Sequence, residues 1–196
     1  FAFTDTELSP FKPTGSFELS FLPRGNLYLA NDGTLFQIVN SELFKARDEG
    51  ISWLRLGAEL YSERKTLAFS PNFDEDGKAF LGLWSPYYSD VTNSIRLSSD
   101  GGKTWRTPEM SLSGSVSEIA VSPTFAVDQT VYVTAVSDVC RLWRSLDGAE
   151  HWQLMTYPPH ESGVRIELEM SPYFAFDQTL FAHIQNDNKL WRSTDG

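Results

Sequence analysis

The residues of this chain best suited to chemistry are a few charged side chains at matching positions of a repeated sequence. Arg64 and Arg165 each stand six positions before the serine of a Ser-Pro pair, and two arginines at one site can bind a carboxylate bidentately. Glu118, Glu167 and Glu169 belong to the same region of the repeat. Paired carboxylates can hydrolyse a glycosidic bond when their separation suits an inverting or a retaining mechanism. Structural ion pairs gather in similar places, so we assign no catalytic residue.

An aromatic segment offers a second kind of chemistry. Residues 85–93 follow Trp84 and form an insertion relative to the next repeat, with two adjacent tyrosines. Exposed aromatic rings can stack on a sugar or a peptide, although side chains of a long loop also commonly pack on a neighbouring element. His160 lies in another long connection and could act as an acid or base, but a solvated loop histidine is the commoner case. The candidate ligand-binding residues are therefore Trp84, Tyr87, Tyr88, Arg64 and Arg165.

Several classes of site have no support in the sequence. His151, His160 and His183 are scattered, and Cys140 has no partner at the spacing of metal ligands, so we expect no metal and no cofactor. A single cysteine also excludes an internal disulfide. There is no glycine-rich phosphate loop that opens a helix, and no Gly-x-Ser-x-Gly motif.

The net charge of the chain limits the classes of macromolecule that we expect it to bind. Its 196 residues include 16 Lys and Arg against 26 Asp and Glu, which gives a formal charge of −10. Binding to phosphate backbones or to anionic membranes needs clustered basic side chains, so we expect no nucleic acid partner and no binding to an anionic membrane surface. No apolar run reaches the roughly 18 residues of a membrane span, so we also expect no direct membrane insertion. The N-terminal residues show no signal-peptide pattern.

The elements that would position these residues are short strands in a repeating unit. The chain has 14 Phe, 7 Tyr and 6 Trp, and short alternating apolar runs are broken by Gly, Pro, Asn, Asp and Ser, with no helical periodicity. One repeated segment reads Ser-Pro-x-Phe and is followed by Asp and then by an aromatic residue; we call it the Ser-Pro turn. A second one, in its fullest form, reads Ser-Ser-Asp-Gly-Gly-Lys-Thr-Trp, and we call it the Asp turn. Copies of the Ser-Pro turn begin at Ser70, Ser122 and Ser171, and copies of the Asp turn occupy 46–53, 98–105, 145–152 and 193–196.

The spacing of these segments predicts a fold. Successive aspartates of the Asp turn are 52, 47 and 48 residues apart. A period near 50 residues with several strands indicates the blades of a β-propeller. We expect one all-β domain over 1–196, a partial β-propeller of about four blades in a larger ring, each blade with four antiparallel strands. The expected blades are 17–57, 66–110, 117–157 and 165–196, the last one incomplete. The fourth strand of the second blade is expected at 104–109.

Both repeated segments have a structural explanation. In the Ser-Pro turn, the proline ends a strand without needing a ladder partner, and the phenylalanine re-enters the core between blades. The Asp turn forms a hairpin. Gly102 supplies a residue that tolerates positive φ in a tight hairpin, and Asp100 can accept bonds from the backbone of its own turn. Trp105 then begins the next strand and can pack between blades. We favour this role over metal binding or catalysis because every blade carries the same aspartate. The residues so assigned are Asp48, Trp53, Ser98, Asp100, Gly102, Thr104, Trp105, Ser145, Asp147, Trp152, Ser193 and Asp195.

The Asp turn resembles the Asp-box, or BNR repeat, of the sialidase-like and sortilin-like propellers. The copy at 98–105 fits this pattern fully, whereas 46–53 departs from it at Ala46 and Ser52, and 145–152 departs at Ala149 and His151. The resemblance covers about residues 17–196 and implies an extracellular, periplasmic or cell-surface protein. Asp-box families include sialidases, sortilin-type receptors, xyloglucan-degrading glycosidases and photosystem assembly factors, so the fold alone does not select a function.

Three functions therefore stay open. The first is a non-catalytic exported scaffold that binds protein or glycan on the face formed by the loops between strands two and three and between blades. The second is a glycoside hydrolase, sialidase-like or glucan-degrading, with Arg64 and Arg165 as substrate clamps on the same face. A sialidase would also need a third arginine, a Tyr–Glu pair, an aspartate that acts as the acid of the reaction, and an Arg-Ile-Pro segment before the first Asp-box. The Arg-Ile-Pro segment is absent. The third is an assembly factor for a membrane complex.

Overall fold

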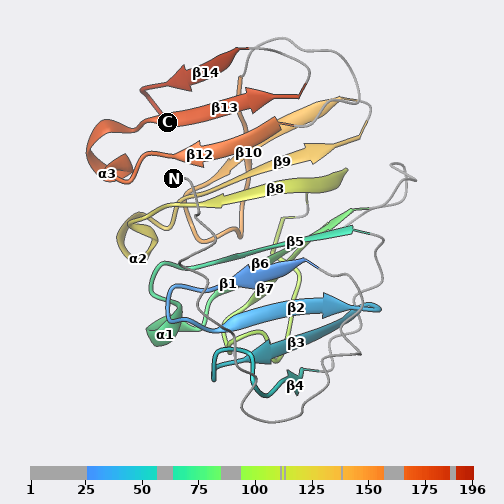
Figure 1. Ribbon diagram of the computed structural model, residues 1–196. Helices are drawn as coiled ribbons and strands as arrows, with labels where there is room; N and C mark the ends of the chain where they lie inside the picture. Colours follow the sequence, from blue (N-terminus) through green and yellow to red (C-terminus); the bar gives the residue numbers. More distant parts are fainter. Residues whose placement is uncertain are drawn as a thin grey trace, which may run out of the picture.

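The computed structural model describes residues 26–56, 64–84, 94–110, 112, 114–137, 139–156, 166–185 and 189–196. These residues form four antiparallel sheets, one per repeat (Figure 1). Blade 1 contains β1 (Leu27–Leu29), β2 (Leu35–Val39), β3 (Glu42–Ala46) and β4 (Leu54–Arg55). Blade 2 contains β5 (Arg64–Phe69), β6 (Ala79–Trp84) and β7 (Ile95–Ser98). Blade 3 contains β8 (Ser115–Val121), β9 (Val131–Val136), β10 (Cys140–Ser145) and β11 (Gln153–Leu154). Blade 4 contains β12 (Ile166–Met170), β13 (Leu180–Ile184) and β14 (Leu190–Ser193).

The predicted all-β architecture is confirmed. Within each sheet, strands that follow one another in the sequence are neighbours, as in an up-and-down propeller blade. The sheets follow one another through the molecule in sequence order, from blade 1 in blue to blade 4 in red (Figure 1). None of the helices among the described residues is long and apolar enough to cross a membrane.

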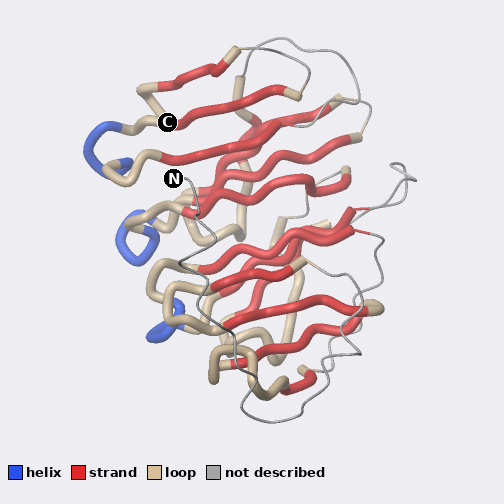
Figure 2. Tube along the Cα trace, in the orientation of Figure 1, coloured by secondary structure: helices blue, strands red, loops and turns tan. Residues whose placement is uncertain are grey.

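Two local expectations were wrong. The fourth strand expected at 104–109 is reduced to a single bridge, in which Leu97 and Arg106 exchange backbone hydrogen bonds of 2.8 and 2.9 Å. Pro108 follows shortly after and cannot donate to a ladder, which explains why pairing stops there. The sequence also indicated no helix, yet each Ser-Pro turn contains one helical turn, too short to produce a periodic pattern. These are α1 (Phe73–Asp76), α2 (Phe125–Asp128) and α3 (Phe174–Asp177), the blue segments of Figure 2.

The Ser-Pro turn is held together by its own side chains. In blade 2 the Ser70 hydroxyl donates to Asp76 at 2.7 Å and accepts from the backbone N–H of Asn72 at 3.1 Å, while Asp76 accepts the N–H of Lys78 at 2.8 Å. Blades 3 and 4 repeat this arrangement with equivalent residues. Each helix ends at a residue in the left-handed region, Gly77 in α1 and a glutamine in the other two. The local sequence therefore specifies the same turn three times.

Aromatic pairs join successive blades. Phe36 on β2 meets Phe73 of α1 edge to face at 5.6 Å between ring centroids. Phe80 on β6 meets Phe125 of α2 in the same way at 5.4 Å, and Tyr132 on β9 meets Phe174 of α3 at 6.1 Å. Each pair lies in one of the three apolar clusters between blades. The strand-two aromatic and the Ser-Pro phenylalanine, which recur in the sequence, are thus the two halves of one inter-blade contact.

The sides of blades 1 and 4 that face no neighbouring blade expose leucines whose equivalents are buried between blades. Leu67, Ile119 and Leu168 are each 7% exposed, whereas Leu27, at the equivalent position of blade 1, is 59% exposed. In strand three the equivalent leucine or isoleucine is buried in blades 1 to 3, but Leu190 of blade 4 is 68% exposed. The two sides therefore carry the apolar halves of the same blade-to-blade contact.

Candidate functional site

The predicted ligand face begins at the ends of β5 and β6. Strand register places Arg64 directly opposite Trp84, on the end of blade 2 that is remote from α1. Trp84 is partly buried and is the residue from which the aromatic segment 85–93 continues. Tyr87, Tyr88 and Arg165 lie outside the described residues, as does the side chain of Arg64. The structure thus brings together the backbones of two of the five candidate residues.

The candidate carboxylates lie on the first strands of blades 3 and 4. Glu118 is opposite Thr134, just after a bulge in β8, and Glu167 is opposite His183, so the two glutamates occupy equivalent positions. The Glu167 carboxylate lies 3.4 Å from His183 Nδ1, with both side chains largely exposed. Tyr28 of β1 lies close enough to Glu118 for the two to interact electrostatically: burial raises the pKa of Tyr28, and the negative charge of Glu118 adds to this increase. The negative charge of Glu118 on blade 3 therefore acts on the phenol of Tyr28 on blade 1.

The single cysteine is not an activated nucleophile. Cys140 is fully buried at the start of β10, and its burial raises the pKa of the thiol to about 11. A thiol with such a pKa is protonated at neutral pH and is a poor nucleophile.

The aspartates of the Asp turns are engaged by their own turns. Asp100 accepts the backbone N–H and the hydroxyl of Thr104 at 2.9 and 2.6 Å, and the hydroxyl of Ser98 at 2.9 Å. Burial alone would raise the pKa of Asp100, but these bonds outweigh it and lower the pKa to about 2. Asp48 is bonded to Ser52 in the same manner, and Asp195 accepts from Ser193. Among the described residues, no cluster of three or more His, Cys, Asp or Glu side chains is arranged to hold a metal ion.

The remaining residues of the Asp turns complete this arrangement. Gly102 is buried with φ of 83°, and the indole N–H groups of Trp53 and Trp105 donate to Gly50 and Gly102 carbonyls at 3.0 and 3.1 Å. In blade 3 Ala149 occupies the position of Gly102 with φ of 76°, and Trp152 is buried in the cluster between blades 2 and 3. A backbone bond of 2.9 to 3.1 Å also links each of the last three Asp turns to the Ser-Pro turn of its own blade.

The Asp turn of blade 3 differs because a histidine replaces the threonine. His151 Nδ1 lies 2.8 Å from Asp147, and its Nε2 lies 3.4 Å from Glu109, which belongs to the segment that joins blades 2 and 3. The hydrogen bond to Asp147 raises the pKa of His151, and the negative charges of Asp147, Glu109 and Glu150 contribute. This group of charges links the joining segment to blade 3.

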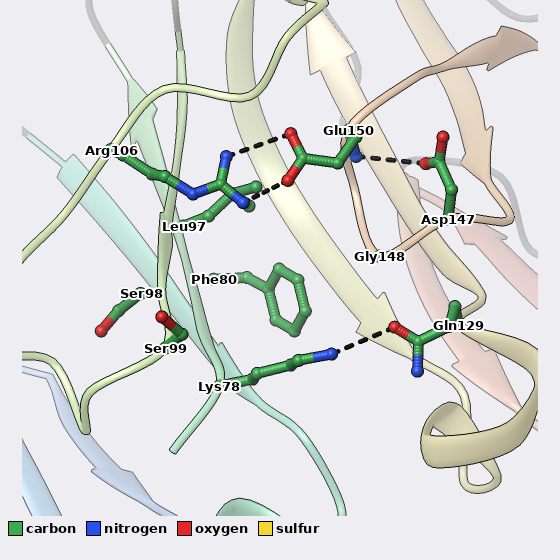
Figure 3. A pocket seen from close by; sticks show the side chains of 10 residues that line it. All are labelled: Lys78, Phe80, Leu97, Ser98, Ser99, Arg106, Gln129, Asp147, Gly148 and Glu150. Atoms are coloured by element: carbon green, nitrogen blue, oxygen red, sulfur yellow. Dashed lines mark hydrogen bonds and ion pairs between the residues drawn. The ribbon is translucent and has the colours of Figure 1, made fainter. Parts of the chain in front are cut away.

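A small pocket lies between blades 2 and 3, where Asp147 and Glu150 of the same turn line it (Figure 3). It encloses about 100 Å³. Leu97 of β7 forms part of its wall. Equivalent positions of the other blades hold long cationic side chains, Lys45, Arg144 and Arg192, and the Arg144 guanidinium reaches the carbonyl of Gly196 in the next blade at 3.2 Å. The pocket exists because the leucine is too short to cross to blade 3. We missed it in the sequence, although the unmatched leucine in the repeat alignment is a signal that could have revealed it.

The pocket is bordered by two bonds that cross between the blades (Figure 3). Arg106 forms a bidentate ion pair with Glu150, one contact of which measures 3.0 Å. Lys78 Nζ donates to Gln129 Oε1 at 3.1 Å and lies 5.0 Å from the centroid of the Phe125 ring. Both carboxylates of the pocket are therefore already paired, Glu150 with Arg106 and Asp147 with its own turn. We interpret this pocket as part of a clamp between blades, because its charged groups are used in holding the sheets together.

Comparison with known proteins identifies the fold of the chain and does not assign it to a family. No protein-family model matches the chain, and no curated protein matches it. A solved structure of YCF48 bound to D1 peptide is similar with a TM-score of 0.57 and 18% identity, over 95% of this chain and 53% of that one. YCF48 from Cyanidioschyzon merolae gives a TM-score of 0.53 at 16% identity, over 90% and 58% of the two chains. The GH74 enzyme of Niastella koreensis gives 0.58 at 15% identity, over 87% and 24%.

These similarities establish the propeller-type fold. At identities below a fifth they carry no information on activity, and they include a peptide-bound protein as well as a glycoside hydrolase. The chain spans about half the length of the YCF48 structures and about a quarter of the GH74 enzyme.

Proposed function

We propose that this chain is part of a non-catalytic Asp-box propeller, exported or displayed at the cell surface, which binds a protein or glycan. The observation that carries the proposal is the register of β5 and β6, which sets Trp84 opposite Arg64 where the aromatic segment 85–93 leaves blade 2. As residue types, a tryptophan can stack on a ligand and an arginine can donate to it bidentately. That combination suits a peptide carboxylate or an acidic sugar.

The state of the charged residues supports a binding role over a catalytic one. The aspartates of the Asp turns accept bonds from their own backbone, and Glu150 is paired with Arg106. Groups bound in this way stabilise turns and blade contacts. A YCF48 structure of similar fold is bound to a D1 peptide, and this adds to the case for a protein ligand.

A glycoside hydrolase is the second candidate, favoured by the equivalent positions of Glu118 and Glu167 on adjacent blades. Two carboxyl groups on neighbouring inner strands are the groups that such a reaction requires. The similar GH74 structure shows that this chemistry is compatible with the fold.

Binding and turnover experiments separate the two candidates. The chain is labelled and applied to a glycan array and to an array of synthetic peptides, in parallel with Trp84→Ala, with Tyr87→Ala plus Tyr88→Ala, and with Leu154→Ser as a control on the edge strand β11. We expect binding to specific spots that both aromatic variants abolish and the control retains. Unchanged binding by both aromatic variants would remove the proposed site.

Turnover is measured with fluorogenic sialosides and glucans. The scaffold proposal expects none, and turnover that is lost in Glu118→Gln or Arg165→Ala would replace it with the hydrolase. Absence of turnover by the full-length protein would remove the hydrolase.

A further inference from the structure

The three one-turn helices lie on the face opposite to the proposed ligand site, at the ends where strand one of each blade passes to strand two. They form a row along one edge of the molecule (Figures 1 and 2). Two positions carry the same residue type in every copy: a buried phenylalanine and an aspartate bonded to the turn serine. The turn therefore depends on these positions and leaves the others free to vary.

The outward positions differ strongly from blade to blade. The third helical residue is Glu75 in α1, Val127 in α2 and Phe176 in α3. The residue before the helix is Asn72, Thr124 and Tyr173 in the same order. The face thus changes from acidic and polar on blade 2 to apolar on blade 3 and aromatic on blade 4.

These apolar side chains are unusually exposed. Phe176 is 88% exposed and Val127 is 87% exposed, the two highest values among the large apolar side chains that the structure describes. Tyr173 is 71% exposed beside Phe176 on the same turn. Leu146, which is 59% exposed, belongs to the Asp turn of blade 3, and that turn is bonded to the end of α2 through the Gly148 N–H and the Gln129 carbonyl at 2.9 Å. We call these four residues the helical apolar face.

The same turn folds with polar residues at these positions in blade 2, so folding does not require the apolar ones. Exposed apolar side chains that gather on one face of a soluble protein commonly mark a surface for another macromolecule. Aromatic residues that are exposed in the free protein and central in a contact contribute most to such binding.

Charge determines which macromolecule fits. Asp74 and Glu75 are exposed on α1, at the acidic end of the row, and the chain as a whole carries −10. A second copy of the chain would bring acidic groups against acidic groups, and an anionic membrane would be repelled. Within α2 and α3 the exposed Ala126, Val127, Ala175 and Phe176 offer no side-chain hydrogen bonds to the hydroxyls of a sugar.

We propose that the helical apolar face docks a protein segment with apolar or aromatic side chains at its centre and Lys or Arg beside them. Tyr173 and Phe176 provide the main apolar contact, and Asp74 and Glu75 attract the basic flank. The surface is distinct from the site proposed around Trp84, so either one can fail without the other.

Synthetic peptides test this surface directly. Two peptides share a central Leu-Phe segment, one with lysines and the other with glutamates on both sides, and their binding is measured by fluorescence anisotropy. We expect the lysine peptide to bind the wild-type chain. The double variant Tyr173→Ser plus Phe176→Ser should bind this peptide at least about tenfold more weakly. Asp74→Asn plus Glu75→Gln should weaken binding more at low than at high ionic strength, because salt already screens the attraction of these two carboxylates for the lysines of the peptide.

The controls separate this surface from the others. Leu154→Ser removes a 52% exposed leucine on β11 and should leave the affinity unchanged. Circular dichroism of the double serine variant verifies its fold, which exposed positions are not expected to disturb. The proposal is overturned if the glutamate peptide binds equally well, if the double serine variant keeps its affinity, or if neither peptide binds. It is also overturned if that variant instead abolishes self-association or binding to phosphatidylcholine vesicles.

Discussion

Replacing Asp100 by asparagine tests whether the Asp turns are structural devices. The carboxylate accepts three hydrogen bonds within its turn, and its pKa falls from 3.8 to about 2. At about 1.36 kcal/mol per pKa unit, this shift corresponds to at most about 2 kcal/mol of folding stability. Solvent partly screens the turn, so we discount the figure to about 1 kcal/mol for Asp100→Asn at pH 7. Because the folded pKa lies below the unfolded one, this stability is present above about pH 4 and is lost as the pH falls toward 2.

Urea denaturation followed by tryptophan fluorescence measures this difference. We expect the gap between the wild type and Asp100→Asn to shrink to about half between pH 7 and pH 3. Asp74→Asn is the matched control, because it removes an exposed carboxylate of α1 and should leave stability within about 0.3 kcal/mol. Equal stability of Asp100→Asn and wild type at pH 7 would refute the structural role. An increase in wild-type stability on adding calcium that the asparagine variant lacks would indicate a metal site instead.

Three further predictions concern the contacts between blades. His151 has a raised pKa, so the stability that it contributes is fully present below about pH 6.5 and is lost as the pH rises through its folded pKa. The difference in melting temperature between wild type and His151→Gln should therefore decline with rising pH, and a constant difference from pH 5 to 9 would contradict this. Gly82→Ala would place a Cβ 2.4 Å from Val116 Cγ1 and 2.6 Å from Thr66 Cγ2, so we expect the free energy of unfolding in urea to fall by about 1–3 kcal/mol, with partial rescue by Val116→Ala. A stability equal to that of the wild type would show that the blades approach each other less closely. A double-mutant cycle of Arg106→Gln and Glu150→Gln should give a coupling free energy of about 0.5–1 kcal/mol that falls in high salt, whereas no coupling would mean that the ion pair does not join the blades.

The bonding of the Asp turn was predicted from the sequence; that of the Ser-Pro turn was not, although it is equally local. Asp100 is bonded to residues two positions before it and four after it, and Ser70 to residues two and six positions after it. Interactions within eight residues leave a pattern that recurs at each copy, and an even spacing of that pattern is enough to specify a propeller. The one-turn helices escaped prediction because four residues are too few to show a period.

The sequence alone therefore determined the fold class, the repeated units and the bonding of the Asp turn. Which side chains pair across blades was decided only by the tertiary structure, since Phe80 and Phe125, or Arg106 and Glu150, come from different repeats more than 40 positions apart. The same holds for the pocket behind Leu97 and for the exposure of Val127, Tyr173 and Phe176. Burial depends on what neighbouring blades cover, and one blade's sequence does not contain that information.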